Sequence, residues 1–448
     1  MRRQQRSVLL VAKGVQMLCA SAVLVCCASQ LAGAQQPGWP AFRGPYGDGH
    51  VLAEGDTKTI GLPLHWSETE NVKWKSALPL QGWSTPVVMD GQVWMTSATE
   101  DGKEFHANCL DANTGAVLFD ETVFTCDNPE PLDNEVNGYA SPSPAIEHGR
   151  VYVHFGSYGT ACLDTATGKA LWKRTDLPCR HLRGPGSSII LFKHLLILTL
   201  DGVDQQYLTA LNKDTGETVW RTDRTTEWND LDEQGKPIRE GDWRKSYTSP
   251  IIIDVAGKPL LISVGSKATY AYEPLTGKAV WNVPMPGFTP AASPAYGAGL
   301  VFVFTGQGQV EMWAIRPDGQ GDVSNKHIAW KTDEAAIIPL EPSPIVIDGL
   351  LYLCSNQGMV TCMEARTGAK VWAKDLGGNF LSSPIYADGK LYFSSTQGKT
   401  TVFKAGPTLE ILATNELENG FMASPAVDGK ALILRTKTHV YRIEETPN

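Results

Sequence analysis

The segment CLDTATGKALW, from Cys162 to Trp172, decides the fold of this 448-residue chain. Its core is Thr-Gly, three further residues and then Trp, and it recurs at identical spacing from Thr167, Thr215, Thr276 and Thr367. A Thr-Gly turn supplies the positive φ that a tight hairpin between two strands requires. A Trp at a constant distance from such a turn indicates one structural position that is used again in each repeat.

A second motif marks the start of each repeat. It is a Ser/Thr-Pro dipeptide before a short apolar strand, and Ser187-Ser188 takes the place of the dipeptide in one copy. The eight copies begin at Thr85, Ser143, Ser187, Ser249, Ser293, Ser343, Ser383 and Ser424. Residues 65–444 provide roughly 48 residues per copy, enough for four strands each, which is typical of propeller blades.

The last copy lacks its final strand, because the chain ends soon after Glu445. An isolated strand pattern with its own Trp, Asn71 to Lys75, precedes the first copy and would complete the last one. Such a closure removes the free sheet edge that an open array exposes. The sequence therefore predicts an all-β, eight-bladed propeller of four-stranded antiparallel blades, closed by an N-terminal outer strand in the last blade.

An aromatic residue at the end of each Thr-Gly segment is expected to dock one blade onto the next, since a large flat ring buries much apolar surface. The predicted docking residues are Trp74, Phe119, Trp172, Trp220, Trp281, Trp330 and Trp372.

The N-terminus has the pattern of a secretory signal peptide in residues 1–34: basic residues up to Lys13, an apolar stretch, and Ala32-Gly33-Ala34 before Gln35. We expect a leader in residues 35–64 and a single propeller domain in residues 65–448. No later segment approaches 18 apolar residues, so we expect an exported protein, periplasmic or at the cell surface, without a transmembrane segment. The net charge of −9 argues against nucleic acid as a partner.

The repeat resembles the tryptophan-docking repeat of pyrroloquinoline-quinone-type β-propellers, a group that includes quinoprotein alcohol dehydrogenases and BamB-like propellers. The resemblance rests on Thr167 to Trp172 with the preceding Cys162-Leu163-Asp164, and it covers about residues 65–444. The leader from Trp39 to Pro45 resembles the start of exported bacterial members. This resemblance implies an eight-bladed ring whose mouth is built by the loops before each first strand.

The chain departs from the dehydrogenases of this group. These enzymes carry a disulfide between adjacent cysteines and hold calcium through a Glu, Asn and Asp set. After residue 34 this chain has no adjacent cysteines, and we identify no such ligand set and no metal site. The sequence predicts no particular cofactor; pyrroloquinoline quinone and calcium belong only to the alternative in which the protein is a quinone-dependent dehydrogenase of alcohols or sugars.

The loops before the first strands contain polar and aromatic residues that could bind a polar, anionic or sugar-like ligand. In that interpretation the basic residues pair with charge, the aromatic rings stack and the amides donate hydrogen bonds. The alternative is that they are solvated loop residues. The candidates are Trp83, Asn137, Tyr139, His181, Arg183, Lys245, Tyr247, Glu341, Asn379, Asn419 and Phe421.

Two further expectations concern the cysteines and the function. Cys126 and Cys179 are predicted to form a disulfide between loops, which an exported protein permits. The protein is expected to be a non-catalytic scaffold of the cell envelope that binds either another envelope protein or a small polar or carbohydrate ligand.

Overall fold

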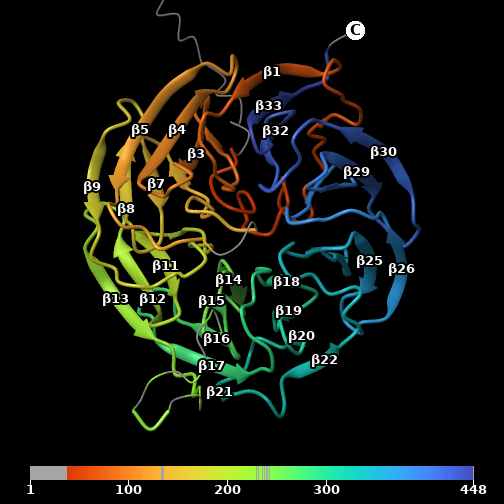
Figure 1. Ribbon diagram of the computed structural model, residues 1–448. Coiled ribbons are helices and arrows are strands. Elements are labelled where there is room, and N and C mark those ends of the chain that lie inside the picture. Colours follow the sequence, from red (N-terminus) through yellow and green to blue (C-terminus); the bar gives the residue numbers. More distant parts are fainter. Residues whose placement is uncertain are drawn as a thin grey trace, which may run out of the picture. The chain divides into compact units, whose positions relative to one another are not determined.

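The computed structural model describes residues 38–132, 136–228, 230, 232–234, 236, 238, 241 and 243–446. The predicted signal peptide, residues 1–34, lies outside these residues. The described residues contain strands and turns and no helix. Eight separate sheets follow one another along the chain, and they are arranged as the blades of a ring (Figure 1). The structure thus confirms the predicted eight-bladed, all-β propeller.

Each blade consists of successive antiparallel strands, ordered from the centre of the ring outward. Blade 1 contains β2 (Val87–Met89), β3 (Gln92–Ala98), β4 (Glu104–Asp111) and β5 (Val117–Thr125). Blade 2 contains β6 (Ala145–Glu147), β7 (Arg150–His154), β8 (Thr160–Asp164) and β9 (Ala170–Arg174). Blade 3 contains β10 (Ile190–Phe192), β11 (Leu195–Asp201), β12 (Gln206–Asn212) and β13 (Thr218–Asp223). Blade 4 contains β14 (Ile251–Val255), β15 (Lys258–Gly265), β16 (Ala268–Tyr272) and β17 (Ala279–Pro284).

The second half of the ring repeats this order. Blade 5 contains β18 (Ala295–Gly297), β19 (Leu300–Phe304), β20 (Met312–Ile315) and β22 (Ile328–Thr332). Blade 6 contains β23 (Ile345–Ile347), β24 (Leu350–Cys354), β25 (Met359–Glu364) and β26 (Lys370–Asp375). Blade 7 contains β27 (Ile385–Ala387), β28 (Lys390–Ser394), β29 (Lys399–Lys404) and β30 (Ile411–Glu416). Blade 8 contains β31 (Ala426–Asp428), β32 (Ala431–Arg435), β33 (His439–Ile443) and β1 (Val72–Ala77).

Blade 8 is completed by the N-terminal strand, as predicted. β1 pairs antiparallel with β33, with Lys75 opposite Tyr441 and Val72 opposite Ile443. Figure 1 shows the red-orange β1 outside the blue β33 and β32. The two ends of the ring are therefore joined within one sheet.

Blade 4 differs from the uniform four-stranded prediction. A short fifth strand, β21 (Gly321–Asp322), pairs parallel with β17. It lies in the elongated connection between β20 and β22, and the N–H of Val323 extends the contact by donating to the carbonyl oxygen of Asn282 at 3.0 Å. The connection of blade 5 therefore covers the outer edge of blade 4.

The docking aromatic residues link neighbouring blades through one recurring contact. The indole N–H of Trp172 in blade 2 donates to the carbonyl oxygen of Lys213 in blade 3 at 3.0 Å, and its ring packs against Gly216. A Cβ at Gly216 would lie 2.8 Å from this ring, so glycine is required there for its small size as well as its positive φ of 76°. Five more indoles make the same bond at 2.9–3.1 Å: Trp74 to Ala112, Trp220 to Pro274, Trp281 to Pro317, Trp330 to Ala365 and Trp372 to Gly406. Phe119 lies against Gly168 and stacks on Trp94.

The core is distributed along the seams between blades. Clusters of buried apolar residues join blades 1 and 2, 2 and 3, 3 and 4, 4 and 5, 5 and 6, and 6 and 7. The largest cluster joins blades 7, 8 and 1 and includes Trp39, Ile60 and Trp66 of the N-terminal leader. The leader therefore contributes residues to the propeller core.

Candidate binding site at the channel mouth

The Ser or Thr that begins each blade lies beside the central channel, and from blade 2 to blade 8 the serine hydroxyl joins its blade to the previous one. The backbone N–H of Thr85 donates to the hydroxyl of Ser143 at 2.9 Å, and the N–H of Ser143 donates to Ser188 at 3.0 Å. Five further bonds of 2.9–3.1 Å continue this series: Ser188 to Ser249, Ser249 to Ser293, Ser293 to Ser343, Ser343 to Ser383 and Ser383 to Ser424. This serine ring holds the inner edges of all eight blades at a common level.

The residue two positions before each member of the serine ring also lines the channel. Side chains alternate along an extended segment, so two residues on the same segment share a side. The eight lining residues at this position are Trp83, Ser141, Gly186, Tyr247, Ala291, Glu341, Leu381 and Met422. Their unequal sizes and charges break the symmetry that the repeats impose.

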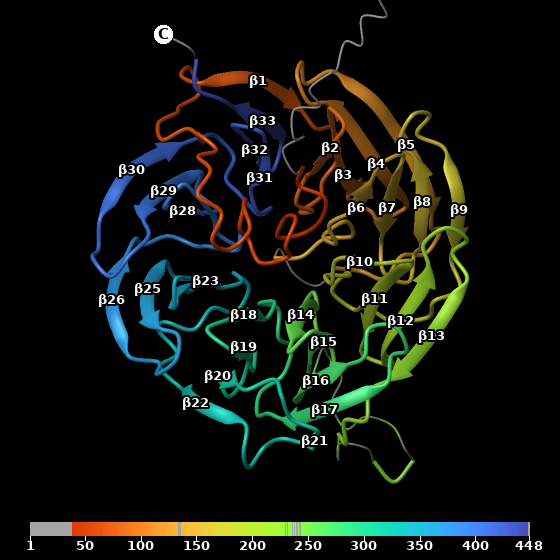
Figure 2. The ribbon, with the colours of Figure 1, turned by 180° about the vertical axis from the view of Figure 1, so that it is seen from behind.

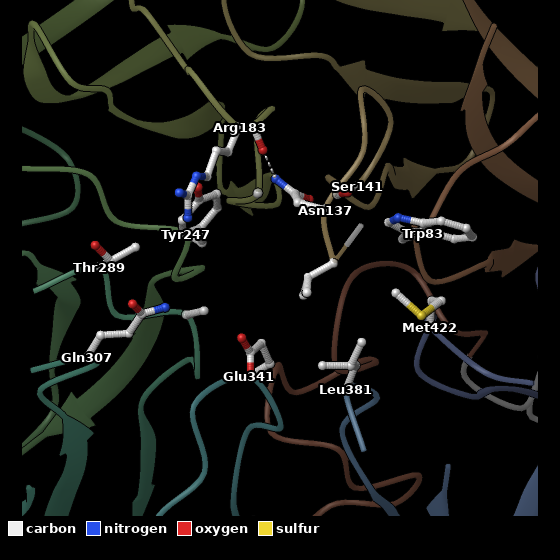
Figure 3. A pocket seen from close by; sticks show the side chains of 13 residues that line it. Trp83, Asn137, Ser141, Arg183, Tyr247, Thr289, Gln307, Glu341, Leu381 and Met422 are labelled. Carbon is white, nitrogen blue, oxygen red and sulfur yellow. Dashed lines mark hydrogen bonds between the residues drawn. The ribbon is translucent and has the colours of Figure 1, made fainter. Parts of the chain in front are cut away.

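A cavity of about 240 Å³ occupies the mouth of the channel (Figure 3). Its described lining adds Val136, Asn137, Arg183, Thr289 and Gln307 to the eight residues above. Figure 3 shows two unlike halves. Arg183, Tyr247, Thr289, Gln307 and Glu341 form a polar half on blades 3 to 6, and Trp83, Leu381 and Met422 form an apolar half on blades 7, 8 and 1.

Glu341 is the one carboxylate among the described residues that line the cavity. One carboxylate oxygen accepts a hydrogen bond from the side-chain amide of Asn356, whose own oxygen accepts from the N–H of Leu340 at 3.0 Å. Burial raises the pKa of Glu341 above its ordinary value, although the bond from Asn356 acts in the opposite direction. A carboxylate in such a place is stabilised by any positive group that enters the cavity.

Arg183 reaches the cavity from a loop that a neighbouring loop holds in place. The side-chain amide of Asn137 donates to the carbonyl oxygens of Arg183 at 2.8 Å and Pro185 at 3.0 Å. Glu130 accepts hydrogen bonds from the backbone N–H groups of His181 at 2.7 Å and Leu182 at 3.0 Å. The backbone around Arg183 is thus clamped to the segment after blade 1.

His181 and Lys245 are buried behind this loop. Lys245 Nζ donates to the carbonyl oxygen of Gly184 at 2.8 Å, lies 3.2 Å from His181 Nδ1 and lies 4.5 Å from the ring centre of Tyr247. His181 Nε2 accepts from the N–H of Ser157 at 2.9 Å. Burial, reinforced by the charge of Lys245, holds the pKa of His181 well below its ordinary value. The imidazole is therefore neutral near pH 7 and supports the loop.

The opposite end of the channel is covered by the leader, drawn in red near the centre of the ring (Figure 2). Phe42 borders the same section of the channel as the serine ring. Trp39 exchanges two backbone hydrogen bonds of 2.8 Å with Val88 of blade 1, and the N–H of Ile146 in blade 2 donates to Pro40 at 2.8 Å. The leader therefore borders the end of the channel that lies opposite the mouth.

Arg43 anchors the leader to the far side of the ring. Its buried guanidinium donates to the carbonyl oxygens of Pro344 in blade 6 at 2.9 Å, of Pro384 in blade 7, and of Asp48 at 2.7 Å. Burial lowers the pKa of Arg43 to about 10, while the nearby charge of Asp48 acts against this. Phe42 is thus fixed by contacts on both sides.

The structure brings five of the candidate ligand-binding residues together in the mouth cavity: Trp83, Asn137, Arg183, Tyr247 and Glu341. The rings of Tyr139 and Phe421 are buried in apolar clusters, and His181 and Lys245 are buried below the loop. Asn379 and Asn419 are exposed and are not part of the cavity lining.

Sequence reasoning missed Ser141, Gly186, Ala291, Leu381 and Met422 as lining residues. It selected loop residues for their chemistry and did not apply the period of two from each Ser/Thr. Counting back two residues from each member of the serine ring would have found all five.

The predicted disulfide is not present in the structure. All six cysteines in the described residues are free, and Cys126 packs with the cluster of blades 1 and 2 whereas Cys179 lies in the cluster of blades 2 and 3. Burial raises the pKa of Cys179 beyond the usual range of thiols. The two loops that carry these cysteines are joined by Glu130 instead, through its ion pair with Arg180 at 3.0 Å.

The described residues do not fit a calcium–quinone centre. Calcium takes six to eight oxygen ligands, usually with several carboxylates, and the described cavity lining contributes one carboxylate, Glu341. Within the described ranges no group of three His, Cys, Asp or Glu side chains is placed to hold a metal ion. In the same ranges no helix is long and apolar enough to cross a membrane.

Comparisons with known proteins agree with the fold. The chain is similar to outer membrane protein assembly factor BamB of Shewanella oneidensis, 22% identical over 257 residues that make up 53% of this chain and 57% of the relative. It is also similar to tetrathionate hydrolase of Acidithiobacillus ferrooxidans, 23% identical over 51% of this chain and 52% of the relative. The chain thus spans only about half the length of these curated relatives.

Solved structures show the same architecture at low sequence identity. BamB of Moraxella catarrhalis matches with a TM-score of 0.55 at 12% identity, covering 83% of this chain and 99% of that one. A europium-containing methanol dehydrogenase matches with a TM-score of 0.53 at 14% identity, covering 91% of each chain. At such identities the likeness shows the fold alone.

The family model described as "Outer membrane protein assembly factor BamB" matches residues 35–203 and 204–446, which together span nearly all of the propeller. The repeats, the docking tryptophans and the ring closure are the features by which the sequence resembles this group. The chain belongs to the BamB-like family of pyrroloquinoline-quinone-type repeat propellers.

Proposed function

We propose that the protein is a non-catalytic binding propeller of the cell envelope, which engages a small ligand or a segment of another envelope protein at the channel mouth. The mouth cavity carries this proposal. It opens through an asymmetric ring of polar and apolar side chains, and the leader covers the other end at Phe42. Concave sites with an apolar wall and a few placed polar groups are typical of ligand binding.

The family and the sequence support a place in the envelope. The Shewanella relative is named as an outer membrane assembly factor, and residues 1–34 have the pattern of a secretory signal. We therefore propose an exported protein whose partner or ligand is found in the same compartment.

The alternative function is a quinone-dependent dehydrogenase of alcohols or sugars, and calorimetry separates the two. The protein is titrated with pyrroloquinoline quinone in the presence of calcium, then assayed with an artificial electron acceptor across alcohols and sugars. We expect neither saturable binding nor turnover above the protein-free control, because the described lining of the cavity contains a single carboxylate, Glu341, where a calcium site usually has several. Turnover that depends on the quinone would overturn the proposal.

A crosslinking experiment tests the binding role directly. A photoreactive amino acid replaces Met422 at the mouth or, as the matched control, Lys193 in an exposed hairpin turn. In cells we expect a crosslinked ligand or protein from the mouth position and none from the control. Crosslinks confined to the control position would contradict binding at the mouth.

A further inference from the structure

Among the described residues, the lining of the mouth cavity combines one positive side chain, one negative side chain and an apolar wall. Arg183 comes from the loop before blade 3, and Glu341 comes from the segment before blade 6. Figure 3 shows both side chains extending toward the cavity, with Tyr247, Thr289 and Gln307 along the polar half between them. A ligand in this cavity therefore meets both charges at once.

Glu341 favours a positively charged group. Only one of its oxygens has a hydrogen bond among the described residues, from Asn356, while the carboxylate faces the cavity (Figure 3). A partly buried carboxylate is costly to keep charged without an opposite charge. A ligand ammonium group placed beside Glu341 would supply that charge and donate hydrogen bonds to the remaining oxygen.

Arg183 favours a negatively charged group. A guanidinium has five N–H donors, so it can bind a ligand carboxylate through two parallel bonds while keeping contacts to the protein. Asn137 fixes the backbone of this residue with a 2.8 Å hydrogen bond to its carbonyl oxygen. Because its backbone is already held in place, Arg183 loses less conformational entropy when a ligand binds.

The apolar half offers a place for a hydrocarbon or aromatic group. Trp83, Leu381 and Met422 lie together on the side of the cavity away from Arg183 (Figure 3). A Trp face stacks on aromatic groups, and a Met side chain adapts to irregular shapes. The volume of about 240 Å³ is small for a ligand site, which favours a compact ligand.

We propose that the mouth binds a small zwitterion with an apolar substituent, namely an amino acid or a short peptide. Its amine lies at Glu341, its carboxylate at Arg183, and its apolar group against Trp83, Leu381 and Met422. This inference rests on the proposed function, because it identifies the ligand class of the same cavity. A neutral sugar or a simple anion would bring no positive group to the carboxylate of Glu341.

Isothermal titration calorimetry with matched probes tests the proposal. L-Phenylalanine and the dipeptides Gly-Phe and Phe-Gly carry both charges, whereas phenethylamine carries only the amine and 3-phenylpropionate only the carboxylate. We expect at least one zwitterion to bind tenfold or more tightly than both single-charge analogues. Preference for phenylalanine would identify free amino acids as the source, and preference for a dipeptide would identify peptides; either supports the proposal.

Variants assign each charge to its residue. Glu341→Gln and Arg183→Gln should each weaken binding of the best zwitterion at least tenfold, and only Glu341→Gln should also weaken binding of phenethylamine. Glu100→Gln and Arg366→Gln are the matched controls, since both residues are exposed and outside the cavity lining. These controls should bind as the unchanged protein does.

The outcomes separate this inference from the proposed function. Equal binding of a zwitterion and a single-charge analogue, or binding unchanged by Glu341→Gln, would overturn the zwitterion assignment. So would a failure of all five probes. If the mouth position of the crosslinking experiment still captures a partner in that case, binding at the mouth stands and only the ligand class is wrong.

Discussion

The indole N–H of Trp74 donates to the carbonyl oxygen of Ala112 at 3.0 Å, so the strand that completes blade 8 also attaches to blade 1. β1 thus makes two connections: its backbone pairs with β33, and its Trp packs against Gly115 in the turn after β4. The closure of the ring depends on both, because each removes an edge or a surface that would otherwise be exposed.

Trp74→Ala is expected to destabilise the propeller by about 3–5 kcal/mol, the range for removing a buried large aromatic side chain. Trp74 is 8% exposed, and loss of its ring leaves a gap beside Gly115 and removes one of the two hydrogen bonds that the carbonyl oxygen of Ala112 accepts, the other coming from Arg442. Urea unfolding followed by tryptophan fluorescence measures the change. Trp74→Phe keeps most of the apolar contact and should lose less; equal losses for both variants would contradict this account.

Ser143→Ala should lower the unfolding free energy by about 1–3 kcal/mol, since the buried N–H of Thr85 loses its acceptor. Ser187→Ala is the matched control, because the Ser187 hydroxyl is buried without a hydrogen-bond partner among the described residues. That control should cost little or raise stability. Chemical denaturation measures the unfolding free energy of each variant, provided that the m-value does not change. An equal loss of stability for the two variants would refute a role for the serine ring.

Arg43→Ala should release the leader from the end of the channel that lies opposite the mouth. The guanidinium donates hydrogen bonds to the carbonyl oxygens of Pro344, Pro384 and Asp48. The substitution removes all three of these hydrogen bonds. Hydrogen exchange of residues 38–51 should become faster, while β1 keeps its protection. Tyr46→Ala removes an exposed side chain from the same segment and should leave exchange unchanged. Protection that survives in Arg43→Ala would show that the leader is held mainly by other contacts.

The sequence predicted the parts of this molecule that the repeat dictates. The pairing of Val72–Ala77 with β33 followed from an incomplete last copy and an isolated Trp, because sheet closure needs a strand at that place. Five of the loop residues chosen from the sequence line the mouth cavity. The other six lie elsewhere, because they were chosen for their chemistry and not from the alternation of side chains along the segment.

The leader could not be placed from the sequence, for a physical reason. Arg43 contacts carbonyl groups that are 301 and 341 residues away along the chain, and no periodicity connects such positions. The cysteine pairing failed similarly: the loops of Cys126 and Cys179 are held by Glu130, and a single ion pair in a loop leaves no pattern in the sequence.

Glu341 should make the stability of the protein depend on pH. Burial raises the pKa of this group in the folded protein above its ordinary value near 4.5, so the folded state binds more protons than the unfolded state between the two values. The unfolding free energy should therefore fall as pH rises through this window, and Glu341→Gln should remove that part of the slope and be at least as stable as the unchanged protein at pH 7.

Ligand binding should show the opposite trend. An ammonium group favours the ionised carboxylate, so affinity for phenethylamine or phenylalanine should rise with pH across the same window and stay flat in Glu341→Gln. Among the described residues, Arg183 and Tyr247 are the other charged or titratable side chains that line the cavity. Denaturation and calorimetry at matched pH values provide the two profiles; parallel rather than opposed slopes would contradict a role for Glu341 in binding a cation.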